Sequence, residues 1–332
     1  MKSKLSFEPR WLAVVIFFLC GAFMGAFVLF IWIFNGGSFY GLQKVHSGSS
    51  SYKYINPTIA VEHKQLTDFF ANEALQGRLN AIVEKYKKDR GVQTASVYFR
   101  DLEPGRWVGI NEEAEFSAGK LLKVPIMIAY YREAEVSPDI LKKQLIYKRD
   151  PNSETQSNQV SLEAGKPYSV EEIIKDMIID DDDNAANMLF DNIDKQALNE
   201  VFSDLGVNYK EDKQSEDLLT VKMYALFFRV LYNATYLNWQ NSEAVLDILS
   251  QTPDTDGISA GLPNDIVTAN KFRTRSMGSG FKEGHDCGII YFPKHPYLLC
   301  AMGIAKDSEV ITNMFRDISQ AVYLDMSDKY KN

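Results

Sequence analysis

The stretch "EFSAGKLLKVPIMIAYY", residues 115–131, is the most informative part of this sequence. At about residue 120 it changes from a mixed segment to a nearly continuous apolar run, which predicts the start of a buried helix. Three side chains with reactive chemistry, Ser117, Lys120 and Lys123, stand at or just before this start. A serine and a nearby lysine can act as nucleophile and base. The stretch therefore raises the question of which residue, if any, attacks a substrate.

The surrounding segments predict two β-rich regions separated by a long helical one. Upstream, residues 66–90 have a helical pattern that stops at Gly91. Two strand-like segments follow, 94–102 and 106–116, and predict a hairpin. Downstream of the helical middle come three strand-like runs and an amphipathic helix: 265–274, 287–292, 297–305 and 308–326. We therefore predict an α+β fold. In this fold, terminal helices flank a five-stranded antiparallel sheet. An all-helical lobe, about residues 120–255, is inserted between the second and third strands.

The N-terminal segment predicts a membrane anchor. Residues 11–34 carry no charge, and at about 1.5 Å per residue such a helix spans a hydrocarbon core of about 30 Å. Lys2, Lys4 and Arg10 precede it, which places residues 1–10 in the cytoplasm. We expect an uncleaved, single-pass signal anchor in the cell membrane, with the C-terminal domain extracytoplasmic.

After this span we expect a linker at residues 35–61, because this segment is rich in Gly and Ser. A globular domain, residues 62–332, is expected to follow. Within the span, Gly21 and Gly25 form a GxxxG pattern that permits a homodimer, although glycines are common in membrane helices. The net charge of −8 argues against nucleic-acid binding. The histidines lack the spacing of zinc sites, so we expect no metal and no cofactor.

Cys287 and Cys300 flank a predicted hairpin whose turn, Pro-Lys-His-Pro, lies near their midpoint. If the strands pair about this turn, the two thiols lie nearly opposite each other, at a separation that permits a disulfide. Two buried free thiols are the alternative. The sequence leaves both possibilities open.

From residue 62 to residue 332, the order of elements and three motifs resemble the class A β-lactamase and penicillin-binding family, which includes DD-peptidase-like proteins. The resemblance implies a serine that attacks an acyl carbon and a lysine that helps to remove its proton. In the Ser-x-x-Lys motif, Lys123 stands at the lysine position, but Lys120 stands at the serine position. A protonated amine is a poor nucleophile. Ser117 is either an alternative nucleophile with Lys120 as its base, or a helix N-cap or surface serine.

The family's second motif, Ser-Asp-Asn, corresponds to Asp181, Asp182 and Asp183 when the chain is registered on Ala-Ala-Asn at 185–187. Only the middle residue matches. A register shifted by one residue ends on Asn184 and restores Asp-Asn, but loses the Ala-Ala-Asn match. An acidic run is also common at a helix start, where carboxylates interact favourably with the helix dipole.

The third motif, Lys-Thr-Gly on a strand, corresponds to Lys271, Phe272 and Arg273. The lysine that binds a substrate carboxylate in the family is kept, but a bulky cation replaces the glycine against which substrate would lie. The resemblance also implies an oxyanion hole made by the backbone N–H groups of Lys120 and Thr274. The short connection at 208–214 contains no Glu-x-x-Leu-Asn stretch for the family's deacylating glutamate.

Three altered motifs favour a catalytically impaired domain that acts by binding. Cell-wall peptide, a β-lactam-like ligand or a protein partner at the cell surface are the candidate ligands. The alternative is an active serine hydrolase, of β-lactamase or D-Ala-D-Ala peptidase type, that uses Ser117. A third hypothesis is a structural membrane protein with an inert ectodomain. The expected site places Lys120, Lys123, Lys271 and Arg273 opposite the three aspartates.

Overall fold

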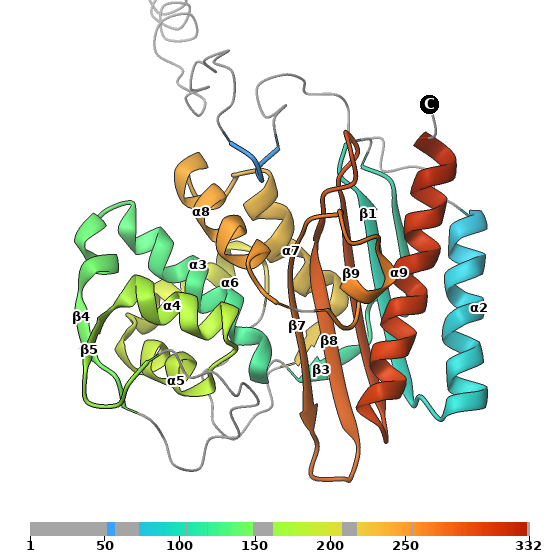
Figure 1. The fold of residues 1–332 in the computed structure, drawn as a ribbon, viewed down its shortest axis with the longest axis horizontal. Helices are drawn as coiled ribbons and strands as arrows, with labels where there is room; N and C mark the ends of the chain where they lie inside the picture. The colour runs from blue at the N-terminus through green and yellow to red at the C-terminus, as the bar shows by residue number, and fades with distance from the viewer. Residues whose placement is uncertain are drawn as a thin grey trace, which may run out of the picture. The chain divides into compact units, whose positions relative to one another are not determined.

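A five-stranded antiparallel sheet forms the centre of the computed structural model (Figure 1). Its strands are β1 Thr94–Asp101, β2 Trp107–Ile110, β7 Thr268–Ser276, β8 Lys282–Ile290 and β9 Tyr297–Ala305. They lie in the order β2-β1-β9-β8-β7, and every neighbouring pair is antiparallel. Because β1 pairs with β9, the N-terminal hairpin and the three C-terminal strands join in one sheet, which confirms the predicted sheet.

The structure describes residues 52–56, 73–103, 105–117, 119–148, 162–207, 218–253 and 255–330. Residues 50–332 form one unit. The predicted membrane span, with Gly21 and Gly25, lies outside the described residues, as does the connection at 208–214. None of the described helices is both long and apolar enough to cross a bilayer.

The predicted second strand is too long. β2 ends at Ile110, and Asn111 takes a positive φ of 50°, so the chain turns there instead of continuing to residue 116. The following segment forms β3, Glu115–Ser117, which pairs with β6, Leu218–Thr220, outside the main sheet. The predicted hairpin segment is therefore divided between two sheets.

The predicted fourth strand of the sheet is too short. β8 begins at Lys282 rather than at Cys287, because buried polar residues continue the strand beyond its apolar part: Glu283, His285 and Asp286. β8 and β9 pair so that Cys287 lies directly opposite Cys300, and the two residues form a disulfide with Cα atoms 3.9 Å apart. Of the two possibilities that the sequence left open, the structure has the disulfide.

Two helices from the ends of the domain cover one face of the sheet: α2 Glu73–Arg90 and α9 Ser308–Tyr330 (Figure 1). α2 contributes apolar side chains at helical spacing, and those that are completely buried are Leu75, Leu79 and Val83. The helix stops before Gly91, whose φ of 73° is typical of a residue that ends a helix. The predicted end of this helix is therefore confirmed, while residues 66–72 of the prediction lie outside the described part.

The helical lobe lies against the other face of the sheet, mainly through α7, whose contacts include β8 and β9. Its helices are α3 Lys123–Ala134, α4 Val170–Ile179, α5 Asp183–Asn192, α6 Lys195–Asp204, α7 Val221–Tyr232 and α8 Trp239–Ser250. The lobe also contains two short paired strands, β4 Gln144–Ile146 and β5 Pro167–Ser169, so the prediction that it is all-helical is wrong. A short 3₁₀ helix, η1 Gly119–Leu122, precedes α3. Ten of the twelve residues of α3 are buried, which confirms the buried helix predicted from the opening stretch.

Side-chain caps fix where the lobe helices α4 to α8 begin. The Ser169 hydroxyl accepts a hydrogen bond from the backbone of Glu172, whose carboxylate in turn accepts from the Ser169 N–H, and this capping box starts α4. Thr220 caps α7, and Asn238 caps α8. Each cap satisfies an N–H that would otherwise lack a partner in the first helical turn. The start of α4 and its length together determine where the acidic run lies.

Candidate functional site

The three aspartates of the second motif form a tight turn between α4 and α5. α4 ends at Ile179, and Asp182 is the N-cap of α5, where its carboxylate accepts a 2.7 Å hydrogen bond from the Asn184 N–H. Asp181 takes a left-handed conformation with a φ of 58°, which aspartate adopts more readily than most residues. As a result, Asp181 and Asp183 face one set of partners and Asp182 faces another.

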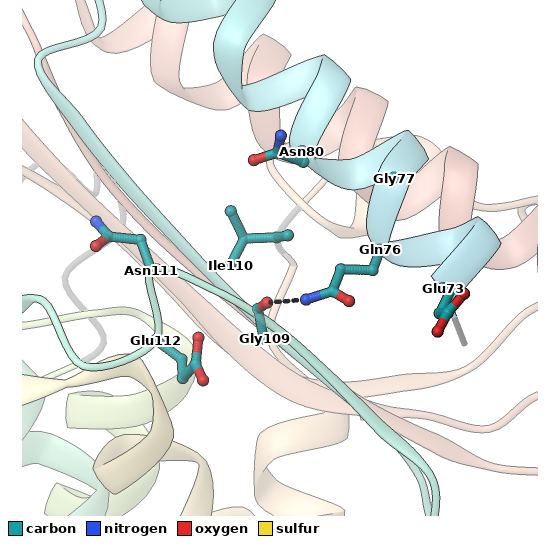
Figure 2. A pocket seen from close by; sticks show the side chains of 8 residues that line it. All are labelled: Glu73, Gln76, Gly77, Asn80, Gly109, Ile110, Asn111 and Glu112. Carbon is teal, nitrogen blue, oxygen red and sulfur yellow. Dashed lines mark hydrogen bonds between the residues drawn. The ribbon is translucent and has the colours of Figure 1, made fainter. Parts of the chain in front are cut away.

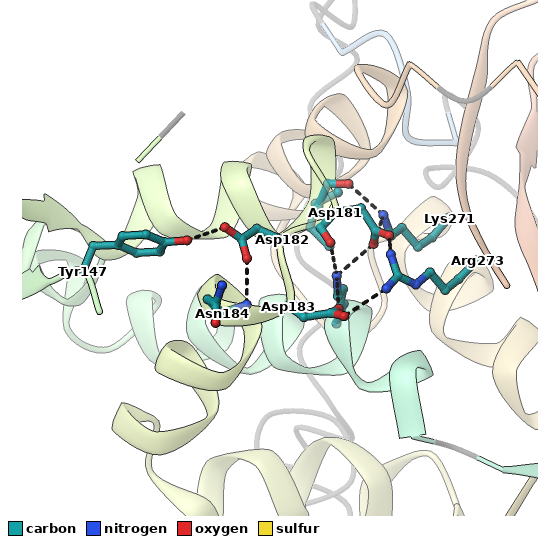
Figure 3. A network of polar contacts seen from close by, with 9 residues as sticks. Tyr147, Asp181, Asp182, Asp183, Asn184, Lys271 and Arg273 are labelled. Carbon is teal, nitrogen blue, oxygen red and sulfur yellow. Dashed lines mark hydrogen bonds and ion pairs between the residues drawn. The ribbon is translucent and has the colours of Figure 1, made fainter. Parts of the chain in front are cut away.

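Asp181 and Asp183 form an ion cluster with Lys123 at the start of α3 and with Lys271 and Arg273 of β7 (Figure 3). Asp181 contacts all three cations. Its Oδ1 lies 2.8 Å from Nζ of Lys123 and 2.8 Å from Nζ of Lys271, and its Oδ2 contacts the Arg273 guanidinium. Asp183 lies 3.0 Å from Nζ of Lys123 and 2.9 Å from Nη2 of Arg273. We call these five residues the ion cluster.

Three separate elements supply the ion cluster. Lys271 and Arg273 project from the same face of β7, because alternate residues of a strand share a face. β7 is an edge strand of the sheet, and Lys271 also donates a 2.9 Å hydrogen bond to the carbonyl of Ile178 in α4. The structure thus brings together residues from all three motifs that the sequence identified.

The ion cluster is buried and nearly neutral. The side chains of Lys123, Lys271 and Arg273 are 4%, 6% and 8% exposed, and those of Asp181 and Asp183 are 24% and 15% exposed. When Lys123 is protonated, three cations face two carboxylates, so the five residues then carry one excess positive charge. A buried ion pair by itself stabilises a protein little, but removing one partner leaves an uncompensated charge.

The surroundings of Lys123 lower the pKa of its amine from 10.5 to about 7. Burial is the largest cause, the nearby charges of Lys271 and Arg273 act in the same direction, and Asp183 opposes the shift. An amine with a pKa near 7 exchanges a proton readily at neutral pH. The lysine of the first motif therefore keeps the acid–base property that a catalytic lysine requires.

We predict that this pKa shift makes the domain more stable as the pH rises from about 7 to about 10.5. In that range the unfolded chain keeps a proton on Lys123 that the folded protein has released, so raising the pH favours the folded state. Urea unfolding at pH 7.5 and 9.5 should show this gain in the wild type and a smaller gain in Lys123→Met. An equal pH dependence in both proteins would contradict the lowered pKa.

Asp182 and Thr274 lie apart from the ion cluster. The Asp182 carboxylate is buried and accepts a hydrogen bond from the Tyr147 hydroxyl, in addition to capping α5 (Figure 3). The Thr274 side chain lies on the opposite face of β7, near Gly284 and Ile311. Asp182 therefore has a clear structural role, whereas the predicted role of Thr274 concerned only its backbone N–H.

Ser117 does not cap α3. It is the last residue of β3, it is buried, and its N–H donates a 3.1 Å hydrogen bond to Oε1 of Glu283. The N-cap position of α3 is held by Leu122, without a side-chain hydrogen bond, so both the predicted capping role and the surface position of Ser117 are wrong. Lys120 lies in η1, and its side chain is outside the part of the structure that is described.

A buried polar group next to Ser117 was not anticipated from the sequence. Glu283 accepts a 2.6 Å hydrogen bond from Nε of Arg275 and lies 3.5 Å from Nε2 of His285. Although burial raises the pKa of the Glu283 carboxyl, interactions with His285 and Arg275 outweigh it, and the pKa is lowered. Glu283, His285 and Cys287 alternate along β8, so reading this run as a strand could have predicted their shared face.

A polar pocket of about 550 Å³ lies at the edge of the sheet opposite to β7, between α2 and β2 (Figure 2). In it, Nε2 of Gln76 donates a 3.4 Å hydrogen bond to the carbonyl of Gly109. Its lining comprises Glu73, Gln76, Gly77, Asn80, Gly109, Ile110, Asn111 and Glu112. None of these was predicted as a site residue. Across the described residues, no group of three or more His, Cys, Asp or Glu side chains is arranged to hold a metal ion.

Comparison with known proteins agrees with this architecture. The model of the Beta-lactamase enzyme family matches residues 74–325. A search of the curated proteins found no match.

Three solved structures illustrate the similarity. A PBP-A mutant in an acyl-enzyme complex with penicillin G is 22% identical, with 78% of this chain and 98% of that chain covered and a TM-score of 0.65. TLA-3 extended-spectrum β-lactamase is 18% identical, with 77% and 99% covered and a TM-score of 0.68. A class A β-lactamase from Mycobacterium abscessus is 18% identical, with 76% and 99% covered and a TM-score of 0.65. At these identities the similarity shows a shared fold.

Proposed function

This chain belongs to the β-lactamase enzyme family, and from that premise we propose that it is a catalytically impaired member that acts by binding an anionic ligand. The observation that carries the proposal is the ion cluster. The Asp181 carboxylate forms ion pairs with Lys123 of the first motif and with Lys271 and Arg273 of the third. A group of cations that is already paired with the protein's own carboxylates is suited to exchange of anions rather than to attack on an acyl group.

The residue at the nucleophile position supports impairment. Lys120 stands where the family has its serine, and an amine that captured an acyl group would form a stable amide instead of an intermediate that water can hydrolyse. Asp183 and Arg273 replace the amide and the glycine of the other two motifs. Each replacement removes a function that acyl transfer needs, and the carboxylate and guanidinium bind each other.

The ligand class follows from the cations. Lys123, Lys271 and Arg273 are held together, and an incoming carboxylate could exchange with Asp181 or Asp183. We propose a cell-wall peptide or a protein partner that presents a carboxylate, with a β-lactam-like ligand as a laboratory analogue. A guanidinium can bind a carboxylate through two parallel hydrogen bonds, which adds specificity.

The location is proposed from the N-terminal sequence. An uncharged span at residues 11–34, preceded by basic residues, supports a single-pass membrane protein with its C-terminal domain outside the cytoplasm. Gly21 and Gly25 support a homodimer through the membrane helix. Carbonate extraction of membranes and protease accessibility in intact cells test the anchor and its orientation.

Incubation of the full-length protein with a reactive penicillin should leave its intact mass unchanged. The reason is that the nucleophile position holds an amine, whereas the PBP-A mutant with this fold forms an acyl-enzyme with penicillin G. A cooperative melting transition of the same sample shows that the protein is folded. An adduct that peptide mapping assigns to Ser117 or Lys120 would overturn the proposal.

The alternative function is an active serine hydrolase with Ser117 as nucleophile and Lys120 as base. One observation supports proton transfer in this region: the pKa of Lys123, three residues after Lys120, is lowered to about 7, as suits an acid–base group. An adduct in the wild type that disappears in Ser117→Ala would establish this alternative. The third hypothesis, an inert ectodomain, requires that no anionic ligand changes the melting temperature.

A further inference from the structure

Five residues from the predicted linker, 52–56, are docked on the domain, shown in blue beside α8 in Figure 1. We call this segment the strap. Tyr54 is 6% exposed and Ile55 is 5% exposed, so both are as buried as core residues. The strap forms no helix or strand, so its position depends on contacts with the rest of the domain.

Glu243 of α8 binds the backbone of the strap. Its carboxylate accepts hydrogen bonds from three successive N–H groups: those of Lys53, Tyr54 (2.8 Å to Oε2) and Ile55 (2.9 Å). Successive N–H groups that converge on one anion form a well-known type of anion-binding geometry. Hydrogen bonds to an ionised acceptor are about twice as strong as neutral ones. The contact therefore selects a bent backbone conformation, as residues 53–55 have, rather than a particular side chain.

Further contacts fix the strap at both ends. The Asn56 N–H donates a 2.7 Å hydrogen bond to the carbonyl of Tyr232, the last residue of α7, where helix carbonyls lack partners within the helix. The Tyr291 hydroxyl donates to the Tyr54 carbonyl (3.1 Å). The ring of Tyr52 packs edge-on against that of Trp239, with centroids 6.2 Å apart.

The strap connects two parts of the domain. Glu243 and Tyr232 belong to the helical lobe, whereas Tyr291 directly follows β8 of the sheet. The strap thus lies across the lobe and the sheet, the same two parts that supply the ion cluster. A segment that only linked the domain to another part of the chain would need none of these contacts.

We propose that the face formed by the end of α7, by α8 and by Tyr291 is a peptide-docking site whose ligand is residues 52–56 of the same chain. The site fixes the point at which the chain leaves the domain. If the span at 11–34 is the membrane anchor, as proposed above, docking leaves residues 35–51, at most about 60 Å of extended chain, between anchor and domain. Release of the strap would lengthen this connection.

Hydrogen exchange of the full-length protein, followed by mass spectrometry, tests the docking site. We expect the amides of residues 53–56 to be protected in the wild type and to exchange at least about tenfold faster in Glu243→Ala, because the variant loses the shared acceptor. The matched control is Glu171→Gln, which removes an exposed carboxylate that pairs with Lys175 in α4 and should leave this protection unchanged. Peptides from β8 and β9 report whether a variant remains folded.

A second variant acts from the strap side. Lys53→Pro deletes one N–H donor to Glu243 without changing α8 and should release the amides of residues 54–56. This variant covers the case in which Glu243→Ala does not fold. Unprotected amides at 53–56 in the folded wild type would overturn the proposal. Protection that is lost on dilution would also overturn it, because a second copy would then supply the strap. These readouts are independent of the membrane anchor and of penicillin binding.

Discussion

Asp181→Ala should lower the free energy of unfolding by about 3 kcal/mol or more, because three nearly buried cations lose a shared carboxylate. Asp183 alone would then face Lys123, Lys271 and Arg273, and the excess of positive charge would rise from one to two. Urea unfolding monitored by circular dichroism measures the change. The same variant should be stabilised by sulfate more than the wild type is, at equal ionic strength, since an anion can replace the missing carboxylate.

Two further variants separate this effect from the loss of any acidic residue. Asp191→Ala changes an exposed aspartate of α5 and should alter stability by no more than about 0.5 kcal/mol. Asp181→Ala combined with Arg273→Ala returns the excess to one cation, so the double variant should be less destabilised than the two single effects predict. If Asp181→Ala behaves like Asp191→Ala, the ion cluster is not a coupled buried network.

A designed reversion should restore acylation, and Asp181 decides whether it succeeds. The triple variant Lys120→Ser, Asp183→Asn and Arg273→Gly rebuilds the nucleophile, the amide and the glycine of the family. We expect it to remain inert toward penicillin, because Asp181 still binds Lys123 and Lys271 (2.8 Å each). Adding Asp181→Ser should remove this carboxylate from both lysines and give a covalent adduct, seen as a mass increase that maps to residue 120.

The adduct of the quadruple variant should be long-lived. The connection at 208–214 contains no counterpart of the family's deacylating glutamate, so a restored serine could be acylated without efficient hydrolysis. The quadruple variant with alanine in place of the new serine is the matched control and should give no adduct. If the triple variant is acylated as readily as the quadruple one, the Asp181 carboxylate does not block the site.

The sequence predicted the fold correctly where local patterns carry the information. Helical spacing identified α2 and α9, and the apolar run after residue 120 identified the buried helix α3. The predicted boundaries failed where polar residues are buried, as at Glu283 in β8. A polar residue breaks the apolar pattern in the sequence, whereas in the folded protein a partner such as Arg275 satisfies it.

The sequence by itself determined the family resemblance, the altered motif residues and the candidate membrane span, because each depends on residue identity at short spacing. Only the tertiary structure decided that Asp181 and Asp183 bind the three cations while Asp182 turns to Tyr147. It also decided that the strap is docked on Glu243. These contacts join residues far apart in the chain, and their geometry depends on backbone angles, such as the positive φ of Asp181, that the packed domain imposes.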